Sequence, residues 1–266
     1  MKRMLKRLAA LLAFSPLILA AHPRSNWKLI WSDEFNGAAR TPPDPAKWMF
    51  DLGGDRWGNK ELEIYTNAPE NIAQDGKGHL VIRALKTDSG YTSARINTRG
   101  KFTVEFGKIA ARMRIPRGQG IWPAFWMLGD DIAKAGWPGC GEIDIMENVG
   151  KEPAVIHGTI HGPGYSGGQG VGATDTLRSR RPLADGFHEY AIEWSPGSIT
   201  FLLDNQPYAT FTPASLPAGT HWVYDHPFFL LLNLAIGGKW PGNPNATTQF
   251  PQALTVDWVR VWQRQP

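Results

Sequence analysis

The chain has 266 residues, of which 42% are apolar, and it contains twelve Trp and a single Cys, Cys140. Its formal net charge is +4, but the first 21 residues contribute four basic side chains and no acidic one, so the remainder is close to neutral (+4 − 4 = 0). A near-neutral chain does not supply the basic stripe that nucleic-acid binding needs, and one Cys excludes an intramolecular disulfide framework.

The N-terminal segment has the pattern of a secretory signal peptide. Four basic residues precede an apolar run from Leu8 to Ala20, and small residues end it. A membrane anchor is the alternative, but the run is shorter than the ~20 residues that span a bilayer, and Pro16 interrupts it. We therefore expect residues 1–21 to be removed on export. The mature protein, residues 22–266, is expected to be secreted or periplasmic and to have no membrane association.

The rest of the chain contains short runs of β-branched and aromatic residues separated by Gly, Pro, Asn and Asp, a pattern typical of strands. More than ten such runs favour an all-β fold, a jelly-roll sandwich of two antiparallel sheets in a single domain. The Pro-rich segment Thr41–Pro45 and the Gly-rich segment Gly162–Gly172 are expected to be loops. The predicted strands are Trp27–Trp31, His79–Ala84, Ala94–Asn97, Phe102–Ile115, Ile121–Leu128, Glu142–Glu147, Val155–His161, His188–Trp194, Ser198–Leu203, Phe228–Ile236 and Leu254–Trp262.

The predicted strand GEIDIMENVG, Gly141 to Gly150, carries three acidic residues. Side chains alternate faces along a strand, so Glu142 and Asp144 share one face while Ile143 points into the core. Strict alternation would send Glu147 to the apolar side, where an unpaired carboxylate is costly. A β-bulge near Ile145 and Met146 resolves this conflict, because one extra residue re-aims the next side chain. The sequence therefore predicts three carboxyl groups on one face.

Such a cluster suits glycoside hydrolysis by two carboxyl groups, one ionised to attack the anomeric carbon and one protonated to serve the leaving oxygen. Retaining glycosidases hold this pair about 5–5.5 Å apart, close to neighbouring same-face positions on a strand. Asp144, between the two glutamates, could keep their pKa values apart, and the three would titrate as a coupled set. Two alternatives stay open on spacing alone: a solvated acidic edge, and an oxygen-ligand site for a divalent ion.

The chain resembles glycoside hydrolase family 16, in particular its laminarinase-like (endo-β-1,3-glucanase) branch. The resemblance covers nearly the whole mature chain. Two residues separate Asp144 from Glu147, a spacing that resembles that branch, whereas the mixed-linkage lichenase branch has only one residue there. The matching segments are WSDEF (Trp31–Phe35), RWGNKELEIYT (Arg56–Thr66), SARINTRGKF (Ser93–Phe102), GIWPAFWML (Gly120–Leu128), WPGCGEIDIMENVG (Trp137–Gly150), HGTIHG (His157–Gly162), NLAIGGKWPG (Asn233–Gly242) and VDWVRVWQ (Val256–Gln263).

The resemblance implies a catalytic domain with a substrate cleft across a concave sheet, and hydrolysis of β-1,3-glucans such as laminarin. It implies that Glu142 is the nucleophile, that Glu147 is the general acid/base and that Asp144 assists. The other residues that it assigns to substrate contact are Asn59, Arg95, Trp122, Trp126, Trp137, His161 and Trp240. For each Trp the alternative is core packing; for Asn59 it is turn stabilisation, and for Arg95 a surface ion pair.

His157 and His161 lie in a segment whose β-branched residues favour a strand. Four residues along a strand span about 13 Å, too far to share one metal, so His161 is expected near Glu147 and His157 is expected to be structural. Cys140 is expected to be a small buried side chain. The resemblance further implies a structural Ca²⁺ away from the cleft, at Glu34, Gly78 and Asp257, with no cofactor needed for chemistry.

Three other functions remain possible: hydrolysis of mixed-linkage glucan or of a galactan, transglycosylation, and non-catalytic binding of β-glucan on the same fold. The intact acid motif argues against the binding module, and specificity among polymers resides in loops. The expected partner is a β-glucan, and the protein is expected to be a monomer.

Overall fold

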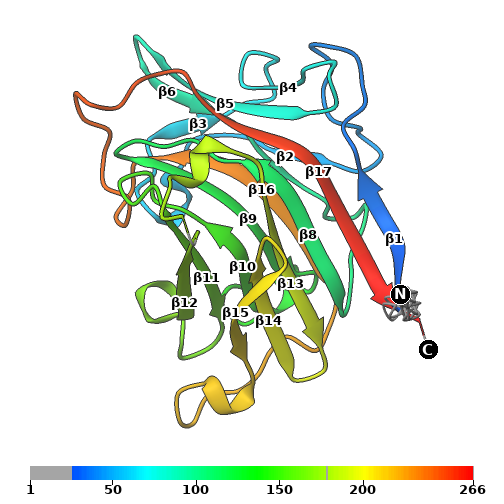
Figure 1. Cartoon of the computed structure of the whole chain (residues 1–266). Helices are drawn as coiled ribbons and strands as arrows, with labels where there is room; N and C mark the ends of the chain where they lie inside the picture. Colours follow the sequence, from blue (N-terminus) through cyan, green and yellow to red (C-terminus); the bar gives the residue numbers. More distant parts are fainter. Residues whose placement is uncertain (1–25, 178, 266) are drawn as a thin grey trace, which may run out of the picture.

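The computed structural model describes residues 26–177 and 179–265, and within these residues the strands form two sheets (Figure 1). The predicted signal peptide, residues 1–21, lies outside the described residues. The first sheet has ten strands, in the spatial order β15 (Gln206–Phe211), β14 (Ser198–Leu203), β13 (His188–Ser195), β8 (Gly107–Arg114), β17 (Gln252–Arg264), β5 (Leu80–Thr87), β6 (Gly90–Ser93) and β3 (Glu63–Tyr65), with β1 (Trp27–Asp33) on β17 and β4 (Ile72–Gln74) on β5.

The second sheet has seven described strands, and it carries the acidic segment. Its order is β12 (Val171–Thr176), β11 (Val155–His161), β10 (Glu142–Glu147), β9 (Ile121–Gly129), β16 (Phe228–Ile236), β7 (Arg95–Asn97) and β2 (Met49–Asp51). Every pair in this sheet is antiparallel. The expected sandwich of two sheets is confirmed.

β17 holds the first sheet together because it is long. Along one edge, β17 pairs with β8 from Thr255 to Trp262. Along its other edge, β17 pairs with β5 over Gln252–Val256 and with β1 over residues 259–264. Two shorter strands thus share one long partner, which explains how a single strand borders three others.

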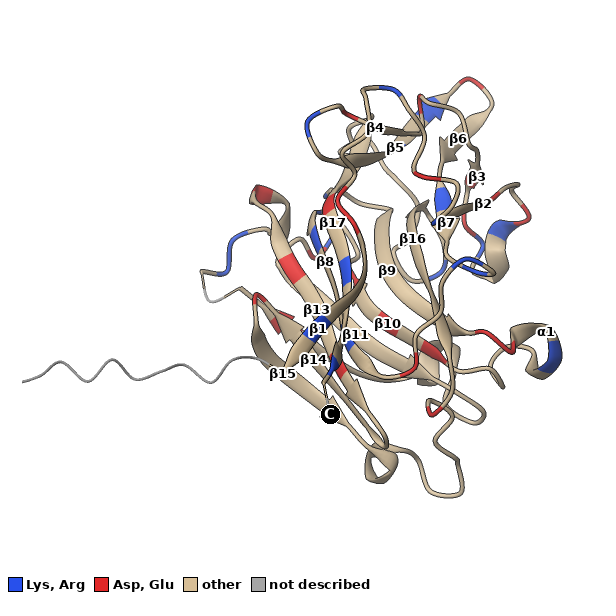
Figure 2. Cartoon of the chain, turned by 90° about the vertical axis from the view of Figure 1, so that its right-hand side faces the viewer, with Lys and Arg blue, Asp and Glu red and all other residues tan. Residues whose placement is uncertain are grey.

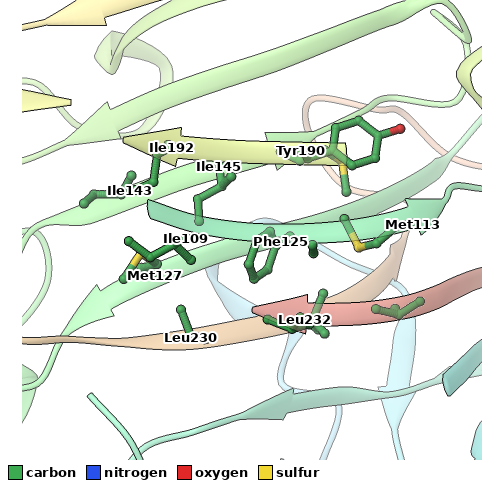
Figure 3. Close-up of a cluster of buried hydrophobic side chains, with 14 of the residues drawn as sticks. Ile109, Met113, Phe125, Met127, Ile143, Ile145, Tyr190, Ile192, Leu230 and Leu232 are labelled. Atoms are coloured by element: carbon green, nitrogen blue, oxygen red, sulfur yellow. The ribbon is translucent and has the colours of Figure 1, made fainter. Parts of the chain in front are cut away.

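The core lies between the two sheets (Figure 3). Ile109 and Met113 of β8 meet Phe125 and Met127 of β9, and all four side chains are fully buried. β16 is buried along its whole length; alternate residues such as Leu230 and Leu232 enter this core, while the others turn to the opposite face of the sheet. Burial of this apolar area from both sheets is the main force that holds them together.

One predicted strand was too long at its start. Phe102–Ile115 was expected to be continuous, whereas β8 begins at Gly107. Phe106 and Gly107 have positive φ angles of 62° and 145°, so the chain turns there. A Cβ at residue 107 would lie 2.3 Å from the carbonyl oxygen of Trp262, and only glycine permits this approach.

Helical structure is limited in the described residues to α1 (Ile132–Ala135) and to 3₁₀ turns at Arg56–Gly58, Gly167–Gln169, Leu183–Asp185 and Pro213–Ser215. None of these has the length and apolar character needed to cross a membrane. Thr41–Pro45 is a loop as expected, and only the end of the expected loop Gly162–Gly172 enters a strand, β12.

Candidate active site

The acidic strand β10 contains the expected bulge. Against β9, Asp144 pairs with Trp126 and Met146 pairs with Phe125, which leaves Ile145 without an opposite residue. Ile145 and Met146 are both buried in the core, so Glu147 returns to the face of Glu142 and Asp144. We call this face of β10, whose acidic positions are red in Figure 2, the acid face.

Burial and mutual repulsion both act on the three carboxyl groups. Asp144 is 3% exposed and Glu147 is 9% exposed. Burial, with the charge of Asp144 second, raises the pKa of Glu142 to about 8. Burial, together with the charges of Asp144 and Glu142, raises the pKa of Glu147 well above its usual range. Burial and the repulsion among neighbouring carboxyl groups therefore both favour the protonated forms of the two glutamates.

Two tryptophans donate hydrogen bonds to the outer carboxyl groups. Trp122 Nε1 donates to Glu147 Oε1 at 3.0 Å, and Trp137 Nε1 donates to Glu142 Oε2 at 2.5 Å. Each donor favours the ionised form of its acceptor and fixes its orientation. Trp137 is half exposed, so its indole ring also presents an apolar surface beside Glu142.

His161 lies opposite Glu142 in the β10–β11 register. Its Nε2 is 3.0 Å from Oδ2 of Asp144. Burial lowers the pKa of His161, but Asp144 and Glu142 outweigh that effect and raise it to about 8. His161 therefore brings a positive charge to the middle of the acid cluster. One ligand atom each from Glu142, Asp144 and His161 lie within 4.8 Å of one another, so a divalent ion could bind there only by using the same atoms.

The acid face continues onto β9 and β16. Trp122 and Trp126 share a face of β9 as expected, while Phe125 and Met127 pack in the core behind them. Trp126 Nε1 donates to Oδ1 of Asn233 at 2.8 Å. Asn233 was not predicted as a site residue, although it is the only polar side chain in the apolar run Phe228–Ile236, and that isolation could have identified it.

Arg95 lies over the ring of Trp126, whereas the Asn59 carbonyl accepts the N–H of Lys239, next to Trp240. The Arg95 guanidinium is 4.7 Å from the ring centroid of Trp57 and 4.8 Å from that of Trp126, and its Nε donates to Asp51 at 2.8 Å. Arg95 thus forms the ion pair considered as its alternative, but within the site and stacked on aromatic rings. Asn59 Nδ2 donates to Oε1 of Glu61 at 3.1 Å.

Trp240 borders the other side of Glu147. It packs edge-on against Trp122, with 5.6 Å between ring centroids, and against His157, with 4.8 Å. His157 is opposite Glu147 in the β10–β11 register, and its Nε2 lies 3.4 Å from Glu152. Trp240 is 38% exposed, so it has free ring surface at this end of the site. His157 supports Trp240 and does not join the cluster of Asp144 and His161.

The two acidic side chains at the predicted calcium site are paired with arginines. Glu34 accepts hydrogen bonds from Nε and Nη2 of Arg260, at 2.9 and 2.8 Å, and Asp257 forms an ion pair with Arg112. Gly78 has a φ of +88° that suits glycine, but this angle does not indicate an ion. Ca²⁺ takes about six to eight oxygen ligands, and two of the three predicted ones would be backbone carbonyls, which these side-chain contacts do not occupy. Calcium at Glu34, Gly78 and Asp257 stays an untested prediction.

Known proteins are similar to this chain in both sequence and fold. The family model described as "Glycosyl hydrolases family 16" matches residues 59–260, a range that contains the whole acid strand. A "Beta-glucanase" of Rhodothermus marinus is 42% identical, over 99% of this chain and 96% of its own length. The laminarinase catalytic domain of Thermotoga maritima superposes with a TM-score of 0.84 at 44% identity, covering 90% of this chain and 99% of that one.

The laminarinase of Rhodothermus marinus superposes with a TM-score of 0.83 at 41% identity, over 91% of this chain and all of that one. These matches span the strands that carry the acid face, and the two sheets are those of the family's jelly roll. The sequence, the fold and the acid strand therefore agree, and the chain belongs to glycosyl hydrolase family 16 and is a glycoside hydrolase.

Proposed function

We propose that this protein is a secreted, retaining endo-β-1,3-glucanase that hydrolyses laminarin-like glucans by double displacement. The observation that carries the proposal is the return of Glu147 to the face of Glu142 by the bulge at Ile145. Two carboxyl groups on one face of one strand suit the short separation of a retaining pair. The names of the relatives, a β-glucanase and laminarinases, support the substrate class.

Glu142 is the nucleophile in this proposal and Glu147 is the acid. Glu147 is buried and its pKa is well above its usual range, so it holds a proton that it can give to the glycosidic oxygen. Glu142 is less buried than Glu147. Burial and Asp144 raise its pKa to about 8, but the His161 charge and the Trp137 N–H lower it and so favour the carboxylate needed for attack on the anomeric carbon. The glycosyl–Glu142 ester is then hydrolysed by water, from which the ionised Glu147 takes a proton.

Asp144 and His161 keep the two roles distinct. Asp144 lies between the glutamates and raises the pKa of both, while the His161 charge compensates Asp144 and lowers the pKa of Glu142. Since His161 lies opposite Glu142 in the strand register, its positive charge favours ionisation of the nucleophile. Asp144 is thus an assisting group.

The aromatic side chains would bind the glucan on either side of the acids. Trp126, Trp137 and Trp240 have ring surface that is not buried in the core, and sugar rings stack on such flat apolar faces. Arg95 lies beside Trp126 and presents a guanidinium group for hydroxyls, while Asn59 lies at the segment of Lys239, next to Trp240. The proposal therefore places sugar units on both sides of the cleaved bond, as endo cleavage requires.

The substrate and the stereochemistry can be tested together. Purified laminarin, mixed-linkage glucan and agar are incubated with the protein, and reducing ends and product lengths are measured. We expect short oligosaccharides from laminarin, and real-time NMR should show the β-anomer first. An initial α-anomer would exclude double displacement, and a preference for agar would exclude the glucan assignment. A product pattern lengthened by acceptor oligosaccharides would indicate transglycosylation.

The roles of the two glutamates are separated by chemical rescue. Glu142→Ala should be inactive on every substrate. Glu147→Ala should still react with a dinitrophenyl glucoside, whose leaving group needs little protonation, and azide should accelerate turnover and yield a β-glycosyl azide. Azide rescue of Glu142→Ala to a β-glycosyl azide, with no effect of azide on Glu147→Ala, would reverse the assignment. Asp144→Asn should lose much activity but not all, and complete inactivity with an intact fold would give Asp144 a larger role.

Export is supported by the basic and apolar residues 1–21. Expression of the full chain in a bacterial host, followed by N-terminal sequencing of the exported protein, tests it. Retention of residue 1 on a cell-associated protein would contradict secretion.

A further inference from the structure

A second pair of carboxyl groups is buried beside the acid face, and the proposed chemistry does not use it. Glu63, the first residue of β3, is 1% exposed, and Glu61 is 6% exposed. The two glutamates are two residues apart in the chain, and the charge of Glu61 raises the pKa of Glu63. Neither residue forms a salt bridge with any Lys, Arg or His of the described residues. Two unpaired buried charges side by side are strongly unfavourable.

The two carboxyl groups differ in their hydrogen-bond partners. Glu61 Oε1 accepts from Asn59 Nδ2 at 3.1 Å, and Glu61 Oε2 accepts from the Tyr65 hydroxyl at 3.2 Å. Glu63 Oε2 accepts from the backbone N–H of Ile236 at 2.6 Å. Glu63 Oε1 is buried and has no hydrogen-bond partner within the described part of the chain. A proton on Glu63 Oε1, donated to Glu61, would satisfy both groups.

The segment that carries Glu61 and Glu63 is hydrogen-bonded both to the network of Trp126 and to the loop of Trp240. A chain of donors runs from Trp126 N–H to Asn233, from the Asn233 amide to Tyr65 and from Tyr65 O–H to Glu61. The ring of Trp126 is therefore oriented through a network that ends on the Glu61 carboxylate.

The same segment also holds the loop that carries Trp240. Leu62 N–H donates to the Ile236 carbonyl at 2.8 Å, and Lys239 N–H donates to the Asn59 carbonyl at 2.9 Å. Because Glu63 receives the Ile236 N–H, its carboxyl group fixes the end of β16 where this loop begins. Trp240 follows within four residues of Ile236.

We propose that Glu63 holds a proton that it donates to Glu61, and that this singly charged pair positions Trp126 and the Trp240 loop for substrate. Glu63 is a positioning residue, since its side chain acts through Tyr65, Asn233 and Ile236. The effect on substrate rests on the function proposed above, whereas the shared proton does not.

The surroundings of the pair favour this protonation. Burial, followed by the negative charge of Glu61, raises the pKa of Glu63 to about 9. Arg95 does not neutralise the pair, because its guanidinium forms an ion pair with Asp51. The titratable and charged groups around the pair are Tyr65 on β3, Tyr91 on β6 opposite Glu63, Arg95 on β7, Glu147 on β10, and the exposed Lys60 and Lys239.

Loss of the proton should weaken binding and leave the acids in place. Above pH 9 the pair would carry two negative charges, and the contact between Glu63 and Glu61 would become repulsive. If only the protonated form binds well, the apparent Kd rises up to about tenfold for each pH unit above the pKa. Glu63→Gln keeps an acceptor for Ile236 and supplies an amide N–H for Glu61 in place of the proton, so it should bind normally and lose this pH dependence.

The proton is measured first, without any substrate. In wild-type protein labelled with ¹³C at glutamate carboxyl carbons, the backbone-assigned Glu63 signal should be that of a neutral acid at pH 7 and should titrate near pH 9. The unfolded chain releases this proton at a pH where the folded chain still holds it, so folding stability falls as pH rises from about 4.5 to 9. The melting temperature of wild type should therefore fall more over this range than that of Glu63→Gln. An ionised Glu63 at pH 7 would overturn the proposal.

Binding is measured in a Glu147→Gln background, which removes the titration of the acid and prevents turnover. Titration with laminarihexaose from pH 7 to 10, followed by Trp fluorescence, should show a Kd that rises above pH 9. The rise should disappear in Glu63→Gln/Glu147→Gln and persist in the control Glu70→Gln/Glu147→Gln, because Glu70 is exposed and paired with Arg40. The same rise with and without Glu63 would refute the positioning role. Absence of binding at any pH would count against the glucan substrate, while the NMR titration would still decide the shared proton.

Discussion

The hydrogen bond from Trp122 to Glu147 is expected to set the upper pH limit of activity. Trp122 Nε1 lies 3.0 Å from Oε1 of Glu147 and stabilises the ionised carboxylate. Phe at position 122 keeps an aromatic ring against Trp240 and removes only the donor. Trp122→Phe should therefore raise the pKa of Glu147 further and keep the general acid protonated to a higher pH.

The size of this shift follows from the strength of the bond. A hydrogen bond to a charged group contributes about 1.5–3 kcal/mol, and one pKa unit corresponds to about 1.4 kcal/mol. Because Glu147 is only 9% exposed, water replaces the lost donor poorly. The alkaline limb of kcat/KM should accordingly move up by about one to two pH units.

The assay is the pH profile of kcat/KM on a laminari-oligosaccharide, which reports the groups of the free enzyme up to the first irreversible step. Both enzymes should carry Glu63→Gln, so that titration of the Glu61–Glu63 pair does not obscure the alkaline limb. An acidic limb that moved while the alkaline limb stayed would refute the reasoning, because Trp122 would then contact the nucleophile. An unchanged profile would show that the Trp122 bond does not hold Glu147 in solution.

Three further predictions follow from other contacts. Trp137→Phe removes the N–H that stabilises ionised Glu142, so the acidic limb of the same profile should move to higher pH, by about one unit because Trp137 is half exposed; a shift of the alkaline limb would contradict this. Cys140 is buried, and burial with the nearby acids raises its pKa to about 11. Ellman's reagent should therefore react with it only after unfolding, and rapid reaction of the native protein at pH 8 would be inconsistent with this placement. Leu232→Ala should lower the free energy of unfolding by about 2–5 kcal/mol in urea titrations, whereas Leu29→Ala, at a side chain 47% exposed, should change it by less than about 0.5 kcal/mol.

The strands that could be predicted from sequence are those that face the core. Val155–His161 and Phe228–Ile236 are observed with the predicted bounds, because their apolar residues recur on one face or fill the run. β12, with the sequence VGATDT, was missed because it is half exposed and has few apolar residues. Its partner β11 holds it in the sheet, and nothing in its own sequence requires that pairing.

The candidate site likewise contains features that the local sequence predicts and features that it does not. Strict alternation along a strand would place Glu142 and Glu147 on opposite faces, and this conflict predicted a bulge from six residues alone. The contact of Asn233 with Tyr65 joins residues 168 apart in the chain, and no local pattern fixes the register that brings them together. The same limit applied to Glu61, whose burial depends on β16 and on the loop after it.

The two carboxyl pairs of this protein show how one physical effect can serve two purposes. Burial raises the pKa of Glu147 on β10 and of Glu63 on β3, and in each pair a neighbouring carboxylate adds to the shift. Glu147 lies on the acid face, where its proton can reach a glycosidic oxygen. Glu63 is 1% exposed and its Oε2 accepts the Ile236 N–H, so the proton that we propose for it could only position neighbouring groups. Access to substrate, and not the pKa alone, therefore separates the catalytic acid from the positioning acid.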